Sequence, residues 1–186
     1  FAHCEIDLYV IATCLDCHQR GVFNGGYEFE DSENLFITNA PIHKAVRASS
    51  CIPGMFEPVK INGRYFIDGE IKQTLSADIG VQLADKIIIS HTYQPLYRSD
   101  GGSVHDLGWL NIVKQSTSMI FSERIAIWRQ IYQQQNPDKE IIWIQPDPED
   151  IEFFAAPEFS FSVDVQRHMI RSGEIAALEA LNRTPV

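Results

Sequence analysis

Short apolar runs alternate with amphipathic stretches along this chain. Residues 6–12 (IDLYVIA), 86–90 (KIIIS) and 140–144 (EIIWI) are almost continuously apolar, a pattern typical of strands buried on both faces of a sheet. Residues 19–23 and 35–38 predict two shorter strands.

Four other stretches place apolar side chains at helical spacing, and each predicts a helix. The predicted helices span residues 40–50, 76–84, about 104–135, and 163–181. Asn39 precedes the first of them as the candidate cap, and Pro53-Gly54 ends it.

Residues 58–68 (PVKINGRYFID) alternate between apolar and polar side chains on either side of Asn62-Gly63. This residue pair favours a tight two-residue turn between antiparallel strands. We therefore predict a hairpin whose tip is Asn62-Gly63.

Alternating strands and helices, with nearly all-apolar strands, indicate an α/β fold. We expect a largely parallel central sheet flanked by helices, with the strands at 6–12, 64–67, 86–90 and 140–144 in one sheet. A chain of 186 residues, 45% of them hydrophobic, can form a single domain. The opening FAHCEIDLYV has neither an initiator Met nor a signal-peptide pattern, and we expect the domain to be incomplete.

The formal net charge of −10 argues against nucleic acid as a partner, because no basic excess is present to neutralise phosphates. It also disfavours broad adsorption to anionic membranes, which leaves peripheral membrane contact through apolar side chains. No apolar run approaches the roughly 20 residues of a membrane span. Four cysteines with no evident pairing favour the cytoplasm or a peripheral membrane location.

Cys14 and Cys17 form one Cys-x-x-Cys pair with His18 beside it. A zinc site would need further ligands, for which His3 and Cys4 are the nearest candidates. A redox pair would be expected at a helix start after a strand. We interpret the cysteines as ordinary reduced thiols and expect no metal and no cofactor.

Asp68 ends the predicted strand RYFI and is followed by Gly69. In open α/β sheets, ligand-binding and catalytic residues lie at the carboxyl ends of the strands. The glycine lets the backbone turn sharply or approach another group closely. From this position alone, the favoured interpretation is that Asp68 only caps the following turn, because Asp-Gly is common in turns, and a catalytic role is the alternative.

Four pieces follow one another between Pro41 and Ile88: ASSCIP, GMFEPV, an apolar strand ending in Asp68-Gly69, and LADKIIIS. The stretch IDLYVIATCLDCHQRGVF precedes them. In this order they resemble the C-terminal portion of the catalytic domain of patatin-like phospholipases. The resemblance covers about half of the chain well.

The resemblance implies hydrolysis of acyl esters, often in phospholipids, by a serine–aspartate dyad without histidine. Asp68 would accept the proton of the serine hydroxyl as that oxygen attacks the ester carbonyl. The substrate would be a lipid or a small acyl ester. Burial at a strand end would raise the pKa of Asp68 towards the working pH.

The chain lacks that family's Gly-x-Ser-x-Gly nucleophile motif and its glycine-rich oxyanion loop. The most similar segment, GGSVH around Ser103, lies in a polar loop and lacks the last glycine of the motif. We expect both elements in a missing N-terminal segment of the same protein, and we expect this chain alone to be inactive.

The residues after Asp68-Gly69 also depart from the family, which has Gly or Ala and then an Asn-Pro type turn. Here they are Glu70, Gln73 and Thr74. If Glu70 shares a face with Asp68 as on a strand, each carboxylate would raise the pKa of the other.

Other candidates have structural alternatives. His91, at the end of residues 86–90, would complete a Ser-His-Asp arrangement or only pack or cap. Arg47 would hold a phosphate or lie on a solvated helix face. Four aromatic residues would line an acyl site, touch lipid or be buried over a sheet edge: Phe153, Phe154, Phe159 and Phe161.

The leading hypothesis is thus a lipid acyl hydrolase of which this chain supplies the aspartate. The second is a binding or scaffold domain that kept the fold and lost the chemistry. A zinc module built on Cys4, Cys14 and Cys17 is a distant third.

Overall fold

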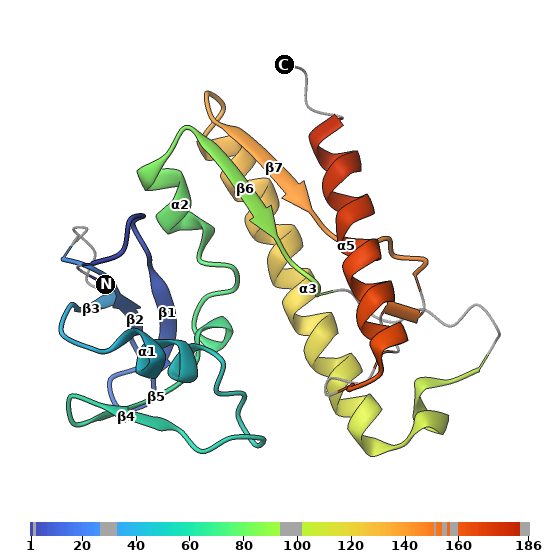
Figure 1. Cartoon of the computed structure of the whole chain (residues 1–186), viewed down its shortest axis with the longest axis horizontal. Helices are drawn as coiled ribbons and strands as arrows, with labels where there is room; N and C mark the ends of the chain where they lie inside the picture. The colour runs from blue at the N-terminus through green and yellow to red at the C-terminus, as the bar shows by residue number, and fades with distance from the viewer. Residues whose placement is uncertain are drawn as a thin grey trace. The chain divides into compact units, whose positions relative to one another are not determined.

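The computed structural model describes residues 1, 3–26, 33–93, 102–150, 152–153, 156 and 160–182. The chain divides into two compact units, Phe1–Ser76 and Ala77–Val186, each of which is described by itself (Figure 1). Helices and strands are mixed in both units, as expected for an α/β protein. The expectation of one incomplete domain stays a prediction.

The first unit is built on a five-stranded sheet in the order β3-β2-β1-β5-β4. Its strands are β1 (Val10–Cys14), β2 (Arg20–Phe23), β3 (Asn34–Ile37), β4 (Val59–Ile61) and β5 (Arg64–Asp68). β2 and β3 pair in parallel. The pairs β1–β2, β1–β5 and β4–β5 are antiparallel.

The expected largely parallel sheet is therefore wrong for the first unit, where the sheet is mixed. The reason lies in the connections, because a short link between strands allows only an antiparallel pair. Five residues join β1 to β2, including His18 at φ 58°. The apolar pattern predicted burial but carried no information on direction. It also placed the first strand too early, since Ile6 is exposed and β1 begins at Val10.

The predicted hairpin is confirmed. β4 and β5 pair antiparallel, with Ile61 opposite Arg64. Asn62 and Gly63 have φ of 48° and 82°, and positive φ at both central residues is the requirement of the tight turn that matches the twist of paired strands.

The core of the first unit lies between α1 (Ile42–Ser49) and the sheet, where the helix packs on β1, β4 and β5. Ala45 and Ala48 are fully buried, and these small side chains let the helix approach the strands closely. Phe23 and Phe66 meet edge to face beneath it, with ring centroids 5.4 Å apart.

The expected side-chain cap of this helix is absent. α1 begins after Pro41, and no side chain caps it. The amide of Asn62 instead donates to Oδ1 of Asn39 at 2.8 Å. Asn39 therefore ties the hairpin tip to the segment before the helix.

The second unit contains a two-stranded sheet and three α-helices among its described residues. Its elements are α2 (Ala77–Leu83), β6 (Lys86–Ser90), the short 3₁₀ helix η2 (Val104–Leu107), α3 (Trp109–Gln135), β7 (Glu140–Ile144) and α5 (Val163–Asn182). β6 and β7 run parallel, and α5 packs on β7 (Figure 1). The long predicted helix is broken at Gly108, which has φ 88°.

The expectation that β1, β5, β6 and β7 share one sheet is not confirmed. Among the described residues, β6 and β7 hydrogen-bond only to each other and make a sheet of their own. Within the described parts of the chain, no helix is both long and apolar enough to cross a membrane.

Candidate active site

Asp68 is the last residue of β5, as predicted, and its backbone is held from two sides. It lies opposite Ala12 of β1 in the antiparallel pair. Its N–H donates to the carbonyl of Cys51, just beyond the end of α1, at 3.0 Å. The strand end is thus fixed to both the central strand and the helix.

Gly69 is required by a close approach to β1. A Cβ on this residue would lie 2.5 Å from the carbonyl oxygen of Ile11. The buried hydroxyl of Thr13 donates to the carbonyl of Gly69 at 3.4 Å and accepts from the N–H of Lys72 at 3.0 Å. Together these contacts fix the turn that carries Asp68.

One carboxylate oxygen of Asp68 accepts the N–H of Glu70 at 3.0 Å, so the residue does cap the following turn, the 3₁₀ helix η1 (Gly69–Ile71). The other oxygen accepts no hydrogen bond from the described residues. Burial raises the pKa of Asp68, and the hydrogen bond from Glu70 opposes this rise. The arrangement leaves a half-buried carboxylate that is oriented through one oxygen and open at the other.

Glu70 does not act on Asp68 as expected. It lies in η1 and not on a strand, so the alternation of side chains that would place it beside Asp68 no longer applies. Both of its carboxylate oxygens accept the N–H of Leu75, at 3.1 and 3.3 Å. The raised pKa of Asp68 therefore comes from burial and not from a second carboxylate.

Cys51 lies close enough to Asp68 for the carboxylate to affect the thiol. Burial raises the pKa of the Cys51 thiol, the positive charge of Arg47 lowers it, and the negative charge of Asp68 raises it. The thiol donates to the carbonyl of Glu57 at 3.0 Å. Arg47 is exposed in the last turn of α1.

Residues 13–80 match the family model of patatin-like phospholipases. The match runs from β1 into α2, covers less than half of the chain and includes Asp68-Gly69. It supports a lipid hydrolase or phospholipase family, whose general activity is ester hydrolysis. It stops before LADKIIIS, so that part of the resemblance has no support from the match. No curated protein matches the chain.

The cysteines were candidate ligands of a zinc ion, with His3 and His18 nearby. Within the described residues, no three His, Cys, Asp or Glu side chains are grouped to hold a metal ion. Cys14 is buried and accepts the N–H of Cys17 at 3.4 Å. Burial is the main cause that raises the pKa of Cys14, and a raised pKa makes a thiol less reactive.

Ser103 is a helix cap in the second unit. Its hydroxyl accepts the N–H of His105 at 3.2 Å, and its own N–H donates to the carboxylate of Asp106 at 3.1 Å. This reciprocal arrangement is a capping box. The interpretation of Ser103 as a loop residue is confirmed.

His91 follows β6 in the second unit, as predicted, and is buried against Trp143.

Two of the aromatic candidates, Phe154 and Phe159, lie outside the described residues. Phe161 is 95% exposed, so the expected burial over a sheet edge is wrong for it. Phe153 is half-buried.

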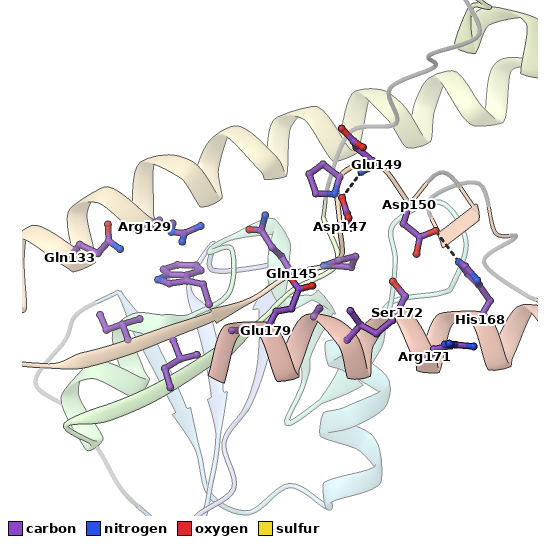
Figure 2. A pocket seen from close by; sticks show the side chains of 18 residues that line it. Arg129, Gln133, Gln145, Asp147, Glu149, Asp150, His168, Arg171, Ser172 and Glu179 are labelled. Atoms are coloured by element: carbon purple, nitrogen blue, oxygen red, sulfur yellow. Dashed lines mark hydrogen bonds and ion pairs between the residues drawn. The ribbon is translucent and has the colours of Figure 1, made fainter. Parts of the chain in front are cut away.

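The second unit also contains a groove of about 920 Å³ that sequence reasoning missed. It lies between α3 and α5, and β7 and the loop after it contribute to its lining (Figure 2). The segment QPDPED, residues 145–150, follows the buried strand β7 and contributes residues to the lining of the groove.

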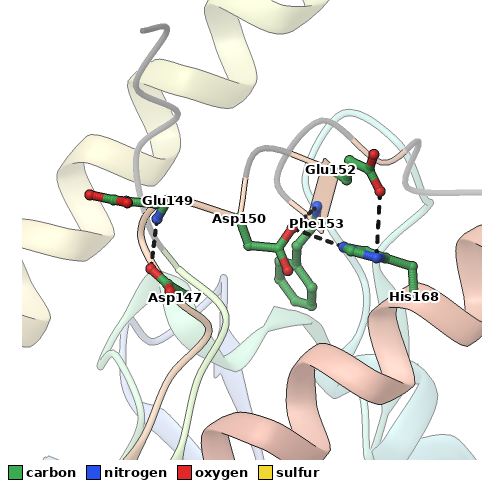
Figure 3. Close-up of polar contacts among 6 residues, drawn as sticks. All are labelled: Asp147, Glu149, Asp150, Glu152, Phe153 and His168. Atoms are coloured by element: carbon green, nitrogen blue, oxygen red, sulfur yellow. Dashed lines mark hydrogen bonds and ion pairs between the residues drawn. The ribbon is translucent and has the colours of Figure 1, made fainter.

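Asp150 anchors this loop to α5. One of its oxygens lies 2.9 Å from Nε2 of His168 and accepts the N–H of Phe153 at 3.0 Å, while Glu152 lies 3.5 Å from the other ring nitrogen (Figure 3). Burial alone would raise the pKa of Asp150, but His168, the Phe153 N–H and the Ser172 hydroxyl together lower it.

Proposed function

We propose that this chain supplies the aspartate of a serine–aspartate dyad in a lipid acyl hydrolase. The observation that carries the proposal is the state of Asp68 inside the matched segment. Its carboxylate is half-buried at the end of β5, has a raised pKa, and keeps one oxygen without a partner among the described residues.

In the proposed reaction, Asp68 accepts the proton of a serine hydroxyl while the serine oxygen attacks the ester carbonyl. The hydrogen bond from Glu70 orients the carboxylate, and the second oxygen takes the proton. A raised pKa brings the base nearer to neutral pH, where proton transfer is most effective. The dyad needs neither metal nor cofactor.

The serine and the oxyanion donors belong, in this proposal, to an N-terminal segment outside these 186 residues. The motivation is the absence of a Gly-x-Ser-x-Gly motif from the chain. The chain would then be the C-terminal portion of one incomplete domain. The substrate is a lipid or a small acyl ester, reached by peripheral contact with a membrane.

The test is Asp68→Asn in the natural gene product. Asn retains the shape and the hydrogen bond to Glu70 but removes the base, so turnover of a short-chain nitrophenyl ester should fall by about a hundredfold to ten-thousandfold. Stability at neutral pH should not fall. A raised folded-state pKa means that ionised Asp68 opposes folding above its unfolded pKa, and Asn removes this cost.

Asp16→Asn is the matched control, because Asp16 also accepts a backbone N–H, that of Tyr65 at 2.7 Å, but is exposed. It should leave turnover unchanged. If Asp68→Asn keeps its activity and melts at a lower temperature, Asp68 is only a turn cap. The purified 186-residue chain should show no ester turnover. Robust hydrolysis by this chain would contradict the proposal that the nucleophilic serine lies outside it.

A scaffold domain without catalysis is the second candidate. The observation that favours it concerns the turn after Asp68-Gly69. Here the carboxylate of Glu70 accepts the N–H of Leu75, whereas patatin-like family members have Gly or Ala and then an Asn-Pro type turn. Complete absence of ester turnover in the natural gene product would support this alternative.

A further inference from the structure

The turn after Asp68 is linked at both ends to one residue, Glu70. Its N–H donates to one carboxylate oxygen of Asp68 at 3.0 Å. Its own carboxylate accepts the N–H of Leu75, with Oε1 at 3.1 Å and Oε2 at 3.3 Å. Glu70 therefore connects the orientation of Asp68 to the end of the turn.

The backbone at the end of this turn has a conformation that its side chains disfavour. Leu75 and Ser76 have φ of 65° and 46°. Residues other than glycine rarely adopt such angles, because Cβ then lies too close to a carbonyl oxygen. Two of them in succession persist only where the surrounding structure holds them. Among the described residues, the group that accepts the Leu75 N–H is the carboxylate of Glu70.

The other hydrogen bonds of the turn hold its middle or are long. The N–H of Lys72 donates to the Thr13 hydroxyl of β1 at 3.0 Å. The N–H of Gln73 donates to the carbonyl of Gly69, and the Ser76 hydroxyl to the carbonyl of Gln73, both at 3.4 Å. Hydrogen bonds to a carboxylate are stronger than those between neutral groups. We therefore expect the end of the turn to depend mainly on Glu70.

The link from Glu70 to Asp68 runs through the backbone and not through charge. Burial raises the pKa of Asp68 and the Glu70 N–H lowers it, whereas the negative charge of Glu70 is not among the causes of the shift. The nearby Cys51 thiol donates to the carbonyl of Glu57, and Arg47 acts on that thiol. Loss of the Glu70 N–H would therefore raise the pKa of Asp68 further and leave its carboxylate free to rotate.

We propose that Glu70 is a positioning residue for Asp68. By accepting the Leu75 N–H, its carboxylate fixes the turn whose N–H orients the Asp68 carboxylate. A group that transfers a proton gains from such alignment, because the reacting atoms must meet in the right geometry. For its effect on turnover, the inference rests on the proposed serine–aspartate dyad. For its effect on the Asp68 carboxylate, it needs only this chain.

Two conservative substitutions separate the reach of the Glu70 side chain from its charge. Glu70→Asp keeps the charge but is one methylene too short to reach the Leu75 N–H. Glu70→Gln keeps the reach and an oxygen acceptor but loses the charge. Glu33→Gln is the matched control, because Glu33 contacts the same turn from an exposed position, through Nζ of Lys72 at 2.9 Å.

Carboxyl-carbon NMR of the labelled 186-residue chain measures the pKa of Asp68 in each variant. We expect Glu70→Asp to raise this pKa above the wild-type value. Glu70→Gln and Glu33→Gln should leave it unchanged. A change in Glu70→Gln with none in Glu70→Asp would show an effect of charge and overturn the proposal. Equal pKa values in all variants would overturn it as well.

Turnover of a short-chain nitrophenyl ester is measured in the natural gene product. Glu70→Asp should lower kcat by about tenfold to a hundredfold, because Asp68 is less well aligned. KM should change little, since Asp68 acts in the chemical step. The acid limb of the kcat profile should move to higher pH, together with the pKa of Asp68. Glu70→Gln should lose less activity, and Glu33→Gln none. A role confined to stability would lower the melting temperature and leave the acid limb in place.

The two measurements separate the inference from the proposed dyad. If the pKa of Asp68 responds as expected but the wild-type gene product has no ester turnover, the hold of Glu70 on Asp68 stands and the dyad is wrong. If turnover depends on Asp68 but is the same in Glu70→Asp as in the wild type, the dyad stands and the positioning role is wrong.

Discussion

Buried polar side chains lie beside the ends of β5 and β6, but they differ in whether they are hydrogen-bonded. Beside the end of β5, the buried Thr13 hydroxyl of β1 both donates and accepts a hydrogen bond and so holds the turn around Gly69. Beside the end of β6, the indole nitrogen of Trp143 in β7 is similarly buried and has no partner among the described residues. A buried polar group with partners fixes the local structure, whereas one without a partner only costs free energy.

The largest stability effect is expected from Gly69→Ala. The added Cβ would lie 2.5 Å from the backbone oxygen of Ile11, so β1 or β5 must shift. We expect the free energy of unfolding to fall by about 3 kcal/mol in urea denaturation. Gly80→Ala in α2 is the control, since its Cβ meets Ile87 at an ordinary 3.5 Å. It should be neutral or stabilising, because alanine favours helices. Equal effects of the two changes would contradict the close approach.

Thr13→Val should cost about 1–2 kcal/mol, because the change removes both hydrogen bonds of the buried hydroxyl, the one to the Gly69 carbonyl and the one from the Lys72 N–H. Thr74 provides a matched pair in the same unit. It is fully buried, and its hydroxyl has no partner among the residues that the structure describes. Thr74→Val should therefore leave the free energy of unfolding unchanged or raise it. A larger loss in Thr74→Val than in Thr13→Val would break the comparison.

His91→Leu should change the free energy of unfolding by less than about 1 kcal/mol in either direction, because it removes buried ring nitrogens at similar volume but also removes the hydrogen bond with the Gln145 side chain. Calorimetric melting at neutral pH measures the effect. A loss larger than about 2 kcal/mol would contradict this balance.

Asp150→Asn should have the smallest effect, visible only in acid. The pKa of Asp150 is lowered in the folded state, so its ionised form contributes stability above its unfolded value near 3.8. That contribution is lost as the pH falls through the folded pKa. The wild type should therefore lose a few tenths of a kcal/mol more than Asp150→Asn between about pH 5 and pH 2. The exposed Asp147→Asn should behave like the wild type, and parallel curves for all three would contradict the prediction.

Local chemistry explains which features could be predicted from sequence. Asn62-Gly63 specifies its turn through positive φ angles that few residues adopt, so the hairpin followed. Asp68 could be placed at the end of β5 because Gly69 interrupts the strand pattern. Strand direction could not be predicted, since an apolar run is buried equally well in either direction.

The candidate sites required three-dimensional information. The position of Glu70 was misjudged because side-chain alternation ends where β5 passes into η1. Arg129 and Trp143 fit the ordinary patterns of an amphipathic helix and a buried strand, and neither pattern shows whether a nitrogen finds a partner. Only the three-dimensional structure shows that Arg129 lies over the Trp143 ring and that Nε1 of Trp143 has no partner among the described residues.

The two-stranded sheet has a consequence for handling the protein. In the described part of the chain, β6 and β7 each pair on one side only, so both outer edges offer free backbone N–H and C=O groups. Their sequences, KIIIS and EIIWI, lack proline and glycine and are rich in β-branched side chains, and Ile88 is 54% exposed. An unpaired strand edge of this kind can hydrogen-bond to a strand of another molecule. Concentrated samples should therefore self-associate through β6 and β7, and a lysine introduced at Ile88 would be the first change to keep them monomeric.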